Sequence, residues 1–471
     1  MKGLKMLLSG AFSVRKRIQS QIFGLSLSLC FLFSYYSSVF AQEKADAGKH
    51  AKYVFLMIGD GMGANHRLAA EKCLPESQKK LVMDSFPYSC LVKTNSTSGI
   101  TDSAAAGTAL ACGVKTNNGV LGLDKDGKRV ESLAELLKKR GFKVAIMTST
   151  PINHATPAAF YAHSSGRGSY SEISSFIPDS GFDLFVGEDF LLSKNEQKPD
   201  ALLKEKGYTL ISSPEAFRNL KKGAEKIVFT HKILSAPKTS DPNKITLSEC
   251  LSKAIELLDD KNGFFIMLEG GQIDWASHAN DLATAVKELF AFDDAVKVAQ
   301  DFQLKNPSET LIVVTADHET GGLELSENCN PSVMVNGQKI SKSEIINQLQ
   351  SLKKEKASFD DVLKKMQEAF GLKELKDSET ESIKQAYNAF MESTPSDARA
   401  EEIKKMYGTK NPIVQACSQI IEDKSGVKWS IGGHTNANVK TSAIGIGAEL
   451  FNGEMDNTEI PGRIKKAIGI E

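Results

Sequence analysis

The chain alternates short apolar runs with amphipathic segments. Runs rich in β-branched and aromatic residues, each bounded by turn-forming or charged residues, cover residues 53–58, 143–147, 264–268 and 311–314. Their length and continuous apolar character predict buried strands. Apolar residues recur with helical spacing over 131–139, which Gly141 ends, and over 282–302. This alternation predicts a three-layer α/β/α fold, in which helices cover a central, mostly parallel sheet.

The pattern changes to charged amphipathic helix between residues 336 and 428. Two apolar stripes mark it, Ile345, Ile346, Leu349 and Leu352 on one, and Val362, Leu363, Met366, Ala369 and Phe370 on the other. We interpret 336–428 as a helical insertion within a single domain that spans 42–471. A partner-binding or subunit-covering module is the alternative. After it, one more strand is predicted at 442–446 and a short helix at 462–468.

The N-terminus has the pattern of an export signal. Five basic residues within 1–17 precede an apolar stretch over 22–40 and the small residue Ala41. We predict that 1–41 is a signal peptide and that the mature protein is periplasmic or secreted, without membrane contact; a retained membrane anchor is the alternative.

Charge and cysteine content change this picture only a little. The chain has 58 basic and 58 acidic residues, so loss of the five basic residues in 1–41 leaves a small acidic excess. Without a basic excess, a nucleic-acid-binding function is not expected. Six cysteines remain after loss of Cys30, and they allow either free thiols or up to three disulfides in fifteen pairings.

Metal-binding side chains follow three of the predicted strands. Asp60 follows the first, Glu269, Asp274 and His278 follow 264–268, and Asp317 and His318 follow 311–314. Ligands in an open α/β sheet bind beyond the carboxyl ends of the strands. Carboxylates and imidazoles together suit zinc and related cations. Asp317 and His318 can share a site only if their strand ends before them, because neighbouring strand residues point to opposite faces.

Two small-residue segments suit an anionic substrate. Glycines in 59–63 let the backbone approach an ion or phosphate closely, and no Walker lysine follows them. The run 101–109 predicts a helix whose N-terminal amides favour an anion near Ser103. An ordinary capped helix with alanine-rich packing is the alternative for this second segment.

Six motifs occur in order along the chain. Together they make the sequence resemble the alkaline phosphatase family. The motifs are Ile58-Gly59-Asp60-Gly61-Met62-Gly63, Thr101-Asp102-Ser103-Ala104-Ala105, Asn153-His154-Ala155-Thr156-Pro157, Glu269-Gly270-Gly271-Gln272-Ile273-Asp274, Thr315-Ala316-Asp317-His318-Glu319 and Gly432-Gly433-His434-Thr435.

The resemblance implies two zinc ions and one magnesium ion per subunit. Their expected ligands are Asp274, His278 and His434 for one zinc, Asp60, Asp317 and His318 for the other, and Asp60, Thr156 and Glu269 for magnesium.

The resemblance also implies the reaction and its substrate contacts. Ser103 is expected to attack phosphate monoesters and form a phosphoserine, which water hydrolyses to release inorganic phosphate. Arg167 would bind the phosphate, and Asp102 would orient that arginine. The family varies at two further positions, where we place His154 in the outer shell of the magnesium site and Trp275 beside the phosphate. Members of the family are usually homodimers.

Three other functions were weighed. A related phosphodiesterase would lack the third metal set of Thr156 and Glu269, and a sulfatase would need a cysteine or modified serine in its own motif. A catalytically inactive exported binding protein would not need the nucleophile, the arginine and every ligand together. The remaining histidines match no motif and are interpreted as structural, namely His50, His66, His163 and His231.

Overall fold

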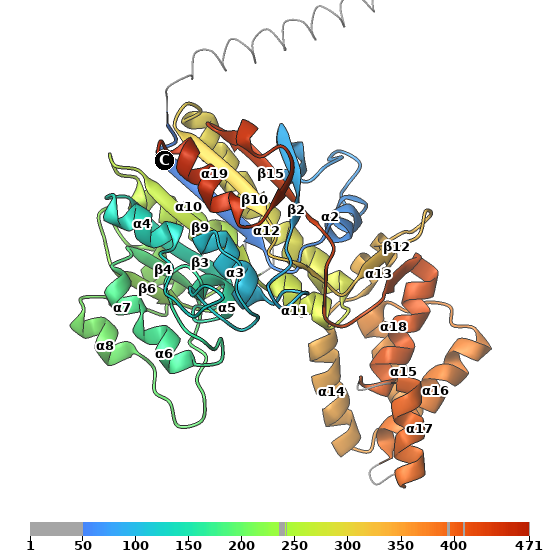
Figure 1. Ribbon diagram of the computed structural model, residues 1–471. Helices are drawn as coiled ribbons and strands as arrows, with labels where there is room; N and C mark the ends of the chain where they lie inside the picture. The colour runs from blue at the N-terminus through green and yellow to red at the C-terminus, as the bar shows by residue number, and fades with distance from the viewer. Residues whose placement is uncertain (1–49, 235–240, 242, 393–395, 408–409, 471) are drawn as a thin grey trace, which may run out of the picture. The chain divides into compact units, whose positions relative to one another are not determined.

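A computed structural model describes residues 50–234, 241, 243–392, 396–407 and 410–470 (Figure 1). The predicted signal peptide, 1–41, lies outside the described residues. Within these ranges, no helix combines the length and the apolar character that a membrane span requires. Cysteines in the same ranges are all free thiols.

Four buried parallel strands form the centre of a ten-stranded sheet. They are β10 (Thr310–Thr315), β1 (Tyr53–Gly59), β9 (Phe264–Gly270) and β3 (Lys143–Pro151), in that spatial order. Tyr53 pairs with Thr310 on one side and with Phe264 on the other, so the three strands β10, β1 and β9 begin and end together. The apolar runs therefore form the strands that their pattern predicted.

The sheet continues on both sides of these strands. On one side β4 (Leu184–Glu188), β6 (Ile227–Thr230) and β5 (Thr209–Ile211) extend it in parallel. On the other, β15 (Val439–Gly445) runs antiparallel to β10 and to β2 (Tyr88–Lys93), and β16 (Gly453–Asp456) pairs with β2. The sheet is thus mixed but mostly parallel, as the sequence predicted.

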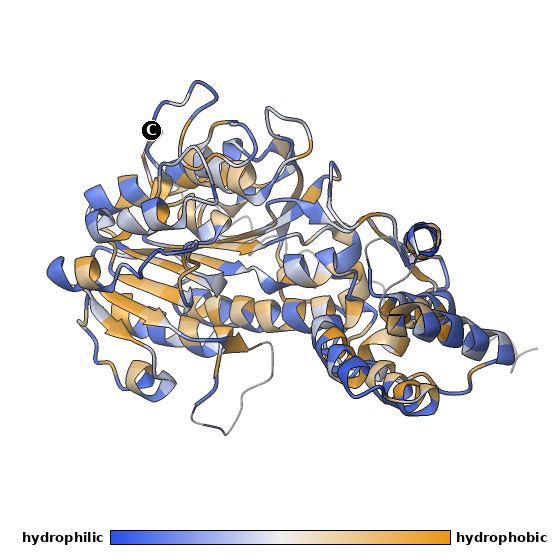
Figure 2. Ribbon diagram, turned by 90° about the horizontal axis from the view of Figure 1, so that it is seen from below, coloured by the Kyte–Doolittle hydropathy of each residue, from blue (hydrophilic) through white to orange (hydrophobic). Residues whose placement is uncertain are grey.

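Helices cover both faces of the sheet, and the apolar strands lie between them (Figure 2). The longest is α12 (Leu282–Lys305), which contacts α10 (Leu247–Leu258), α11 (Gln272–His278) and α2 (Ala64–Glu71). A second group contains α3 (Ser103–Cys112), α4 (Leu133–Lys139), α5 (Ala155–Ala158) and α19 (Glu459–Ala467). Rings of Tyr53, Phe55, Phe264 and Phe302 pack with centroids 4.9 to 5.8 Å apart.

Shorter elements complete the main body. They are η1 (Met83–Ser85), α6 (Tyr170–Ser175), α7 (Ile177–Ser180), α8 (Asp200–Glu205), α9 (Pro214–Arg218), β7 (Ile233–Leu234), β8 (Ile245–Thr246), β11 (Glu319–Thr320), β12 (Leu323–Leu325), β13 (Val427–Trp429), β14 (His434–Thr435) and η2 (Ala448–Leu450).

In the described residues, six helices follow β12 before the chain pairs with β12 again at β13. They are α13 (Ser332–Gly337), α14 (Lys342–Lys354), α15 (Phe359–Phe370), α16 (Asp377–Met391), α17 (Asp397–Tyr407) and α18 (Pro412–Ser425). Apolar positions of the predicted stripes, such as Leu349 and Met366, are buried among these helices. Because β12 pairs with β13, the helical segment between them begins and ends at the same place on the main body.

Candidate active site

Strand register brings the predicted ligands to one edge of the sheet. Ile58 lies beside Glu269 on β9 and beside Thr315 on β10. Asp60 therefore lies two residues beyond the level of Glu269, just after its own strand, and β10 ends before Asp317. Because the strand has already ended, Asp317 and His318 both turn into the same buried crevice.

Asp60, Asp317 and His318 form the first group of side chains that could hold a metal ion. The His318 Nε2 atom lies 3.2 Å from Asp317 Oδ2 and 3.5 Å from Asp60 Oδ1. All three side chains are fully buried. Ser103 Oγ lies 3.2 Å from the same His318 Nε2 atom, so the predicted nucleophile adjoins this group.

Asp274, His278 and His434 also come together. His278 Nε2 lies 3.4 Å from Asp274 Oδ2 and 3.1 Å from His434 Nε2, and His434 Nε2 lies 3.8 Å from Asp274 Oδ1. Antiparallel pairing of β11 with β14 brings His434 back from beyond the six helices. The His318 and His434 rings stack with centroids 3.6 Å apart, and Asp274, His318 and His434 form a further possible ligand group. The two predicted zinc sites thus adjoin each other.

The third group contains Asp60, His154 and Glu269. Thr156 Oγ1, at the start of α5, donates to Asp60 Oδ2 at 3.3 Å. One nitrogen of the His154 ring therefore lies within 4.8 Å of carboxylate oxygens of Asp60 and Glu269, two of the predicted magnesium ligands.

Hydrogen bonds that Nδ1 donates fix the orientation of three imidazoles. His278 Nδ1 donates to the Gly432 carbonyl at 2.7 Å, and His434 Nδ1 donates to the Thr101 carbonyl at 2.8 Å. Thr320 Oγ1 donates to Asp274 Oδ1, so it accepts from His318 Nδ1 at 3.1 Å. In the neutral form of each ring the lone pair is consequently on Nε2, the atom that faces the other predicted ligands, as a metal-binding histidine requires.

Several buried atoms of these groups have no hydrogen-bond partner among the described residues. They are Asp60 Oδ1, Asp317 Oδ2, Glu269 Oε1 and His154 Nδ1. An unpartnered buried oxygen is costly unless a cation or water satisfies it. The donor set of carboxylates and imidazoles, with free atoms converging on the crevice, therefore fits divalent metal ions.

Burial and mutual repulsion shift the pKa values of the carboxylates away from their ordinary values. Burial, with the charges of Asp317 and Asp274, raises the pKa of Asp60 well above its ordinary value. Burial also raises the pKa of Glu269 to about 7 and that of Asp317 to about 6. For Asp274, burial is outweighed by the hydrogen bond from His278 and nearby positive charge, which lower its pKa. A bound cation would offset this repulsion.

The imidazoles of the crevice are held mainly neutral. Burial lowers the pKa of His318 to about 4 and, together with Arg167, that of His154 to about 4. Burial also lowers the pKa of His434. The hydrogen bond to Asp274 raises the pKa of His278, which is more exposed than the others. Neutral rings are the form that ligates metals.

Ser103 is the first residue of α3, and Asp102 is its N-cap. Asp102 Oδ1 accepts from the Ala105 amide, while Oδ2 accepts from Arg167 Nη1 at 3.0 Å and from the Gly119 amide at 3.0 Å. Ser103 thus begins a helix whose N-cap residue binds a guanidinium, and helix N-terminal amides together with a guanidinium favour a phosphate dianion.

Trp275 stands at the margin of this site and is 38% exposed. Its ring contacts His154 edge to face, with centroids 5.7 Å apart, and His154 Nε2 lies 3.3 Å from Arg167 Nη2. Trp275 therefore lies near the predicted phosphate position, at the opening of the crevice.

Some side chains that contact the predicted ligands were not identified from the sequence patterns. Thr148 and Thr150 both donate to Glu269 Oε2, and Thr320 joins His318 to Asp274. Thr320 follows Asp317 and His318 by only a few residues, so its position in that motif is a signal that could have identified it. Thr148 and Thr150 lie in an ordinary strand sequence, and only tertiary contact reveals them.

The other histidines have structural contacts. His163 bonds to the Gly122 carbonyl and to Glu135, and His66 Nε2 lies 3.1 Å from Ser277 Oγ. His231 contacts the carbonyls of Ser212 and Asn243.

Comparison with known proteins shows which family the chain matches. A family model described as alkaline phosphatase matches residues 51–189 and 227–470. Alkaline phosphatase 3 of Bacillus subtilis is 31% identical over 451 residues, which cover 91% of each chain. A cold-active alkaline phosphatase from Shewanella sp. is 27% identical with a TM-score of 0.72, over 88% of this chain and 99% of that one. A variant of the TAB5 alkaline phosphatase with Mg bound in its M3 site is 27% identical with a TM-score of 0.62, over 90% and 99%.

Proposed function

The chain belongs to the alkaline phosphatase family and hydrolyses phosphate monoesters, and from this premise we propose that Ser103 is its nucleophile. Ser103 Oγ forms a bond to phosphorus as the ester bond to the alcohol breaks. Water then attacks the phosphoserine and releases inorganic phosphate, so configuration at phosphorus is retained. The placement of Ser103 Oγ 3.2 Å from His318 Nε2, inside a crevice of unpartnered metal-ligand atoms, carries this proposal.

Chain residues bind and orient the phosphate. Arg167 donates to two phosphate oxygens, because its planar fork allows bidentate contact. Asp102 accepts from Arg167 Nη1 and so fixes the guanidinium beside the helix N-terminus. Trp275 and His154 border the same position.

Metal ions complete the site. We propose one zinc ion held by Asp274, His278 and His434, and a second held by Asp60, Asp317 and His318. Such ions lower the pKa of a hydroxyl or water and neutralise developing charge on oxygen.

The third ion in this proposal is magnesium, held by Asp60, Thr156 and Glu269, with His154 adjoining. A solved relative, a histidine-to-glutamate variant of TAB5 alkaline phosphatase, has Mg bound in its M3 site. Metal analysis of the purified protein tests the proposed stoichiometry of two zinc ions and one magnesium ion.

Substitution of the nucleophile tests the mechanism. Ser103→Ala is expected to lower kcat for an aryl phosphate at least about a thousandfold, because no covalent intermediate can form. Exposed Ser175 offers a matched control, and Ser175→Ala should retain activity. Full activity of Ser103→Ala, or of protein shown by metal analysis to be metal-free, would overturn the mechanism. Faster hydrolysis of a diester or sulfate ester than of the monoester would favour the two related activities instead.

We also propose that residues 1–41 are removed on export and that the enzyme acts as a periplasmic or secreted homodimer. N-terminal sequencing of the exported protein and its mass in solution by light scattering test these two statements. A mature N-terminus far from residue 42, or a monomeric mass, would refute them.

A further inference from the structure

A cavity of about 1040 Å³ lies against the face of α11 that carries no predicted metal ligand. Successive residues of a helix are 100° apart, so Gln272, Ala276 and Ala279 share one face while Asp274 and His278 share another. The first three line the cavity. Trp275 projects between the two faces and lines it as well.

Contacts of Trp275 connect the cavity to the phosphate position. Its ring packs edge to face on His154, and His154 Nε2 lies 3.3 Å from Arg167 Nη2. Arg167 in turn bonds to Asp102, the residue before Ser103. Trp275 therefore lines the cavity and also belongs to the series of contacts that ends at the predicted phosphate-binding residues.

The cavity wall includes a segment that the family model does not match. Residues 190–226 lie between the two matched ranges, and Phe190, Leu210, Ile211 and Ser212 from this segment line the cavity. Residues at the start of α14 and just before it also line the cavity, namely Ile340, Ser341 and Ser343. This space is thus built in part by residues outside the common family pattern.

We propose that the cavity binds the nucleoside part of a nucleoside monophosphate while Arg167 and Ser103 engage its phosphate. This inference rests on the proposed function. A pocket of this volume exceeds the needs of a small alcohol. Trp275 provides an aromatic face for a base, and apolar side chains such as Leu210 and Ile340 flank it. Charged side chains of both signs, including Asp189 and Lys232, can satisfy base and ribose hydrogen bonds.

Filling the cavity tests its role in the metal-loaded enzyme. Ser212 and Ser343 are exposed lining residues from two different walls. In Ser212→Phe/Ser343→Phe, kcat/KM for adenosine 5′-monophosphate should fall roughly five- to thirtyfold, while that for methyl phosphate should stay unchanged. The matched control Ser252→Phe/Ser351→Phe places the same rings on exposed helix positions outside the cavity and should alter neither value. Equal effects on both substrates, or none, would refute the subsite.

Direct binding gives a second measurement that does not depend on turnover. The chain has two tryptophans, so Trp429→Phe leaves Trp275 as the sole indole. Adenosine without phosphate should quench its fluorescence saturably, and the cavity-filling pair should weaken that binding by a similar factor. Absence of saturable quenching would count against the subsite. If the wild-type enzyme cleaved neither ester, the proposed function would fail, and adenosine binding would still decide whether the cavity accepts a nucleoside.

Discussion

The Asp102 carboxylate has two structural roles, because Oδ1 caps α3 and Oδ2 accepts a hydrogen bond from Arg167. We expect Asp102→Asn to keep the cap but weaken the charged contact, so that the inhibition constant of inorganic phosphate rises about tenfold. Asp102→Ala should in addition lower the free energy of unfolding by about 1 kcal/mol, since the cap is lost. Phosphate inhibition assays and denaturant unfolding measure the two effects separately. Equal phosphate inhibition in the wild type and both variants would contradict this account.

Asp60 is buried among other carboxylates and is proposed to bind two ions. Without metal, Asp60→Asn should stabilise the protein by about 1–3 kcal/mol, because repulsion from Asp317, Asp274 and Glu269 is relieved. With zinc and magnesium present the same variant should be less stable than wild type, because binding of the ions stabilises the native state.

Thermal unfolding with and without chelator measures this change of sign. Asp126→Asn, at an exposed position, is the matched control and should show no such dependence on metal. An Asp60→Asn variant that is destabilised equally in both conditions would contradict the proposed bridging role.

Among the elements, α4 shows how local sequence and tertiary contact combine. The sequence predicted a helix over 131–139, and the helix begins at Leu133 because Ser132 and Glu135 form a capping box. Glu135 also accepts from Arg129 and contacts His163 from a distant segment. Burial opposes its charge, but the bonds to His163 and Ser132 prevail and lower the pKa of Glu135 to about 2.

This shift predicts a specific loss of stability in acid. The folded-state pKa of about 2 is below the ordinary value of 4.5, so the contribution is fully present above pH 4.5 and is lost as pH falls towards 2. It should amount to about 2–3 kcal/mol. The difference in unfolding free energy between wild type and Glu135→Gln should therefore shrink across that window. Metal ligands titrate in both proteins, so the difference isolates Glu135, and a difference independent of pH would contradict the prediction.

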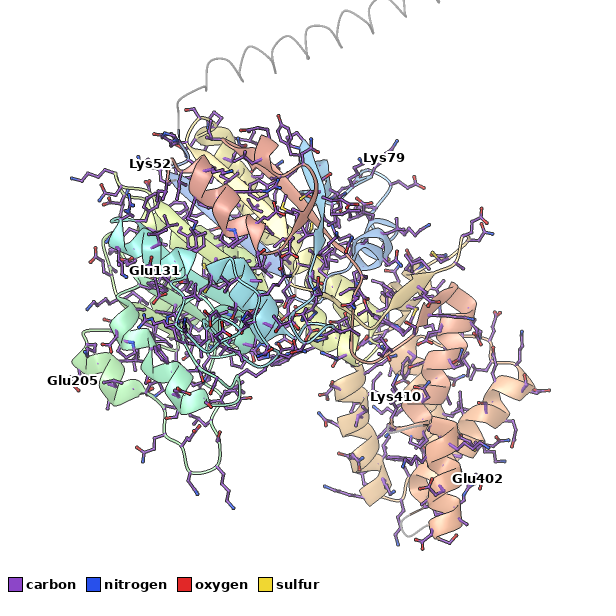
Figure 3. The ribbon with its side chains drawn as sticks, in the orientation of Figure 1. Lys52, Lys79, Glu131, Glu205, Glu402 and Lys410 are labelled. Atoms are coloured by element: carbon purple, nitrogen blue, oxygen red, sulfur yellow. The ribbon has the colours of Figure 1, made fainter. Side chains whose placement is uncertain are left out.

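On the scale of the whole molecule, Asp281 joins the six helices to the main body. It is buried, caps α12 by accepting from the Thr284 amide, and accepts from Gln338 Nε2 and the Lys342 amide at 2.7 Å each. Neighbouring Asn280 is contacted by Lys342 and by Lys410, which Figure 3 labels among these helices. The junction lies just beyond α11, which carries Asp274 and His278.

Loss of this carboxylate should loosen the helical segment. Asp281→Ala should cost about 2–4 kcal/mol of stability, because a cap and several buried donors lose their acceptor. Hydrogen exchange should rise first in α13 and α14. The exposed first-turn residue Asp377 offers the control Asp377→Ala, which should leave α13 and α14 protected. Unchanged exchange in Asp281→Ala would show that other contacts hold the segment.

The sequence alone determined the strands of the sheet centre, most helix stripes and the positions of the predicted ligands after their strands. These follow from local periodicity and from the rule that parallel strands end together, as β10, β1 and β9 do. Antiparallel β2 and β15 could not be inferred in the same way, because their pairing joins segments far apart in the chain.

The tertiary structure decided which residues far apart in the chain contact one another. It brought His434 beside Asp274, turned the His278 and His434 rings through the Gly432 and Thr101 carbonyls, and placed His154 near Asp60 and Glu269. Local sequence cannot specify such contacts, because they depend on packing between distant segments. The same packing formed the cavity beside Trp275 from several separate parts of the chain. Residue types therefore determined which chemistry was available, and the fold decided which atoms meet.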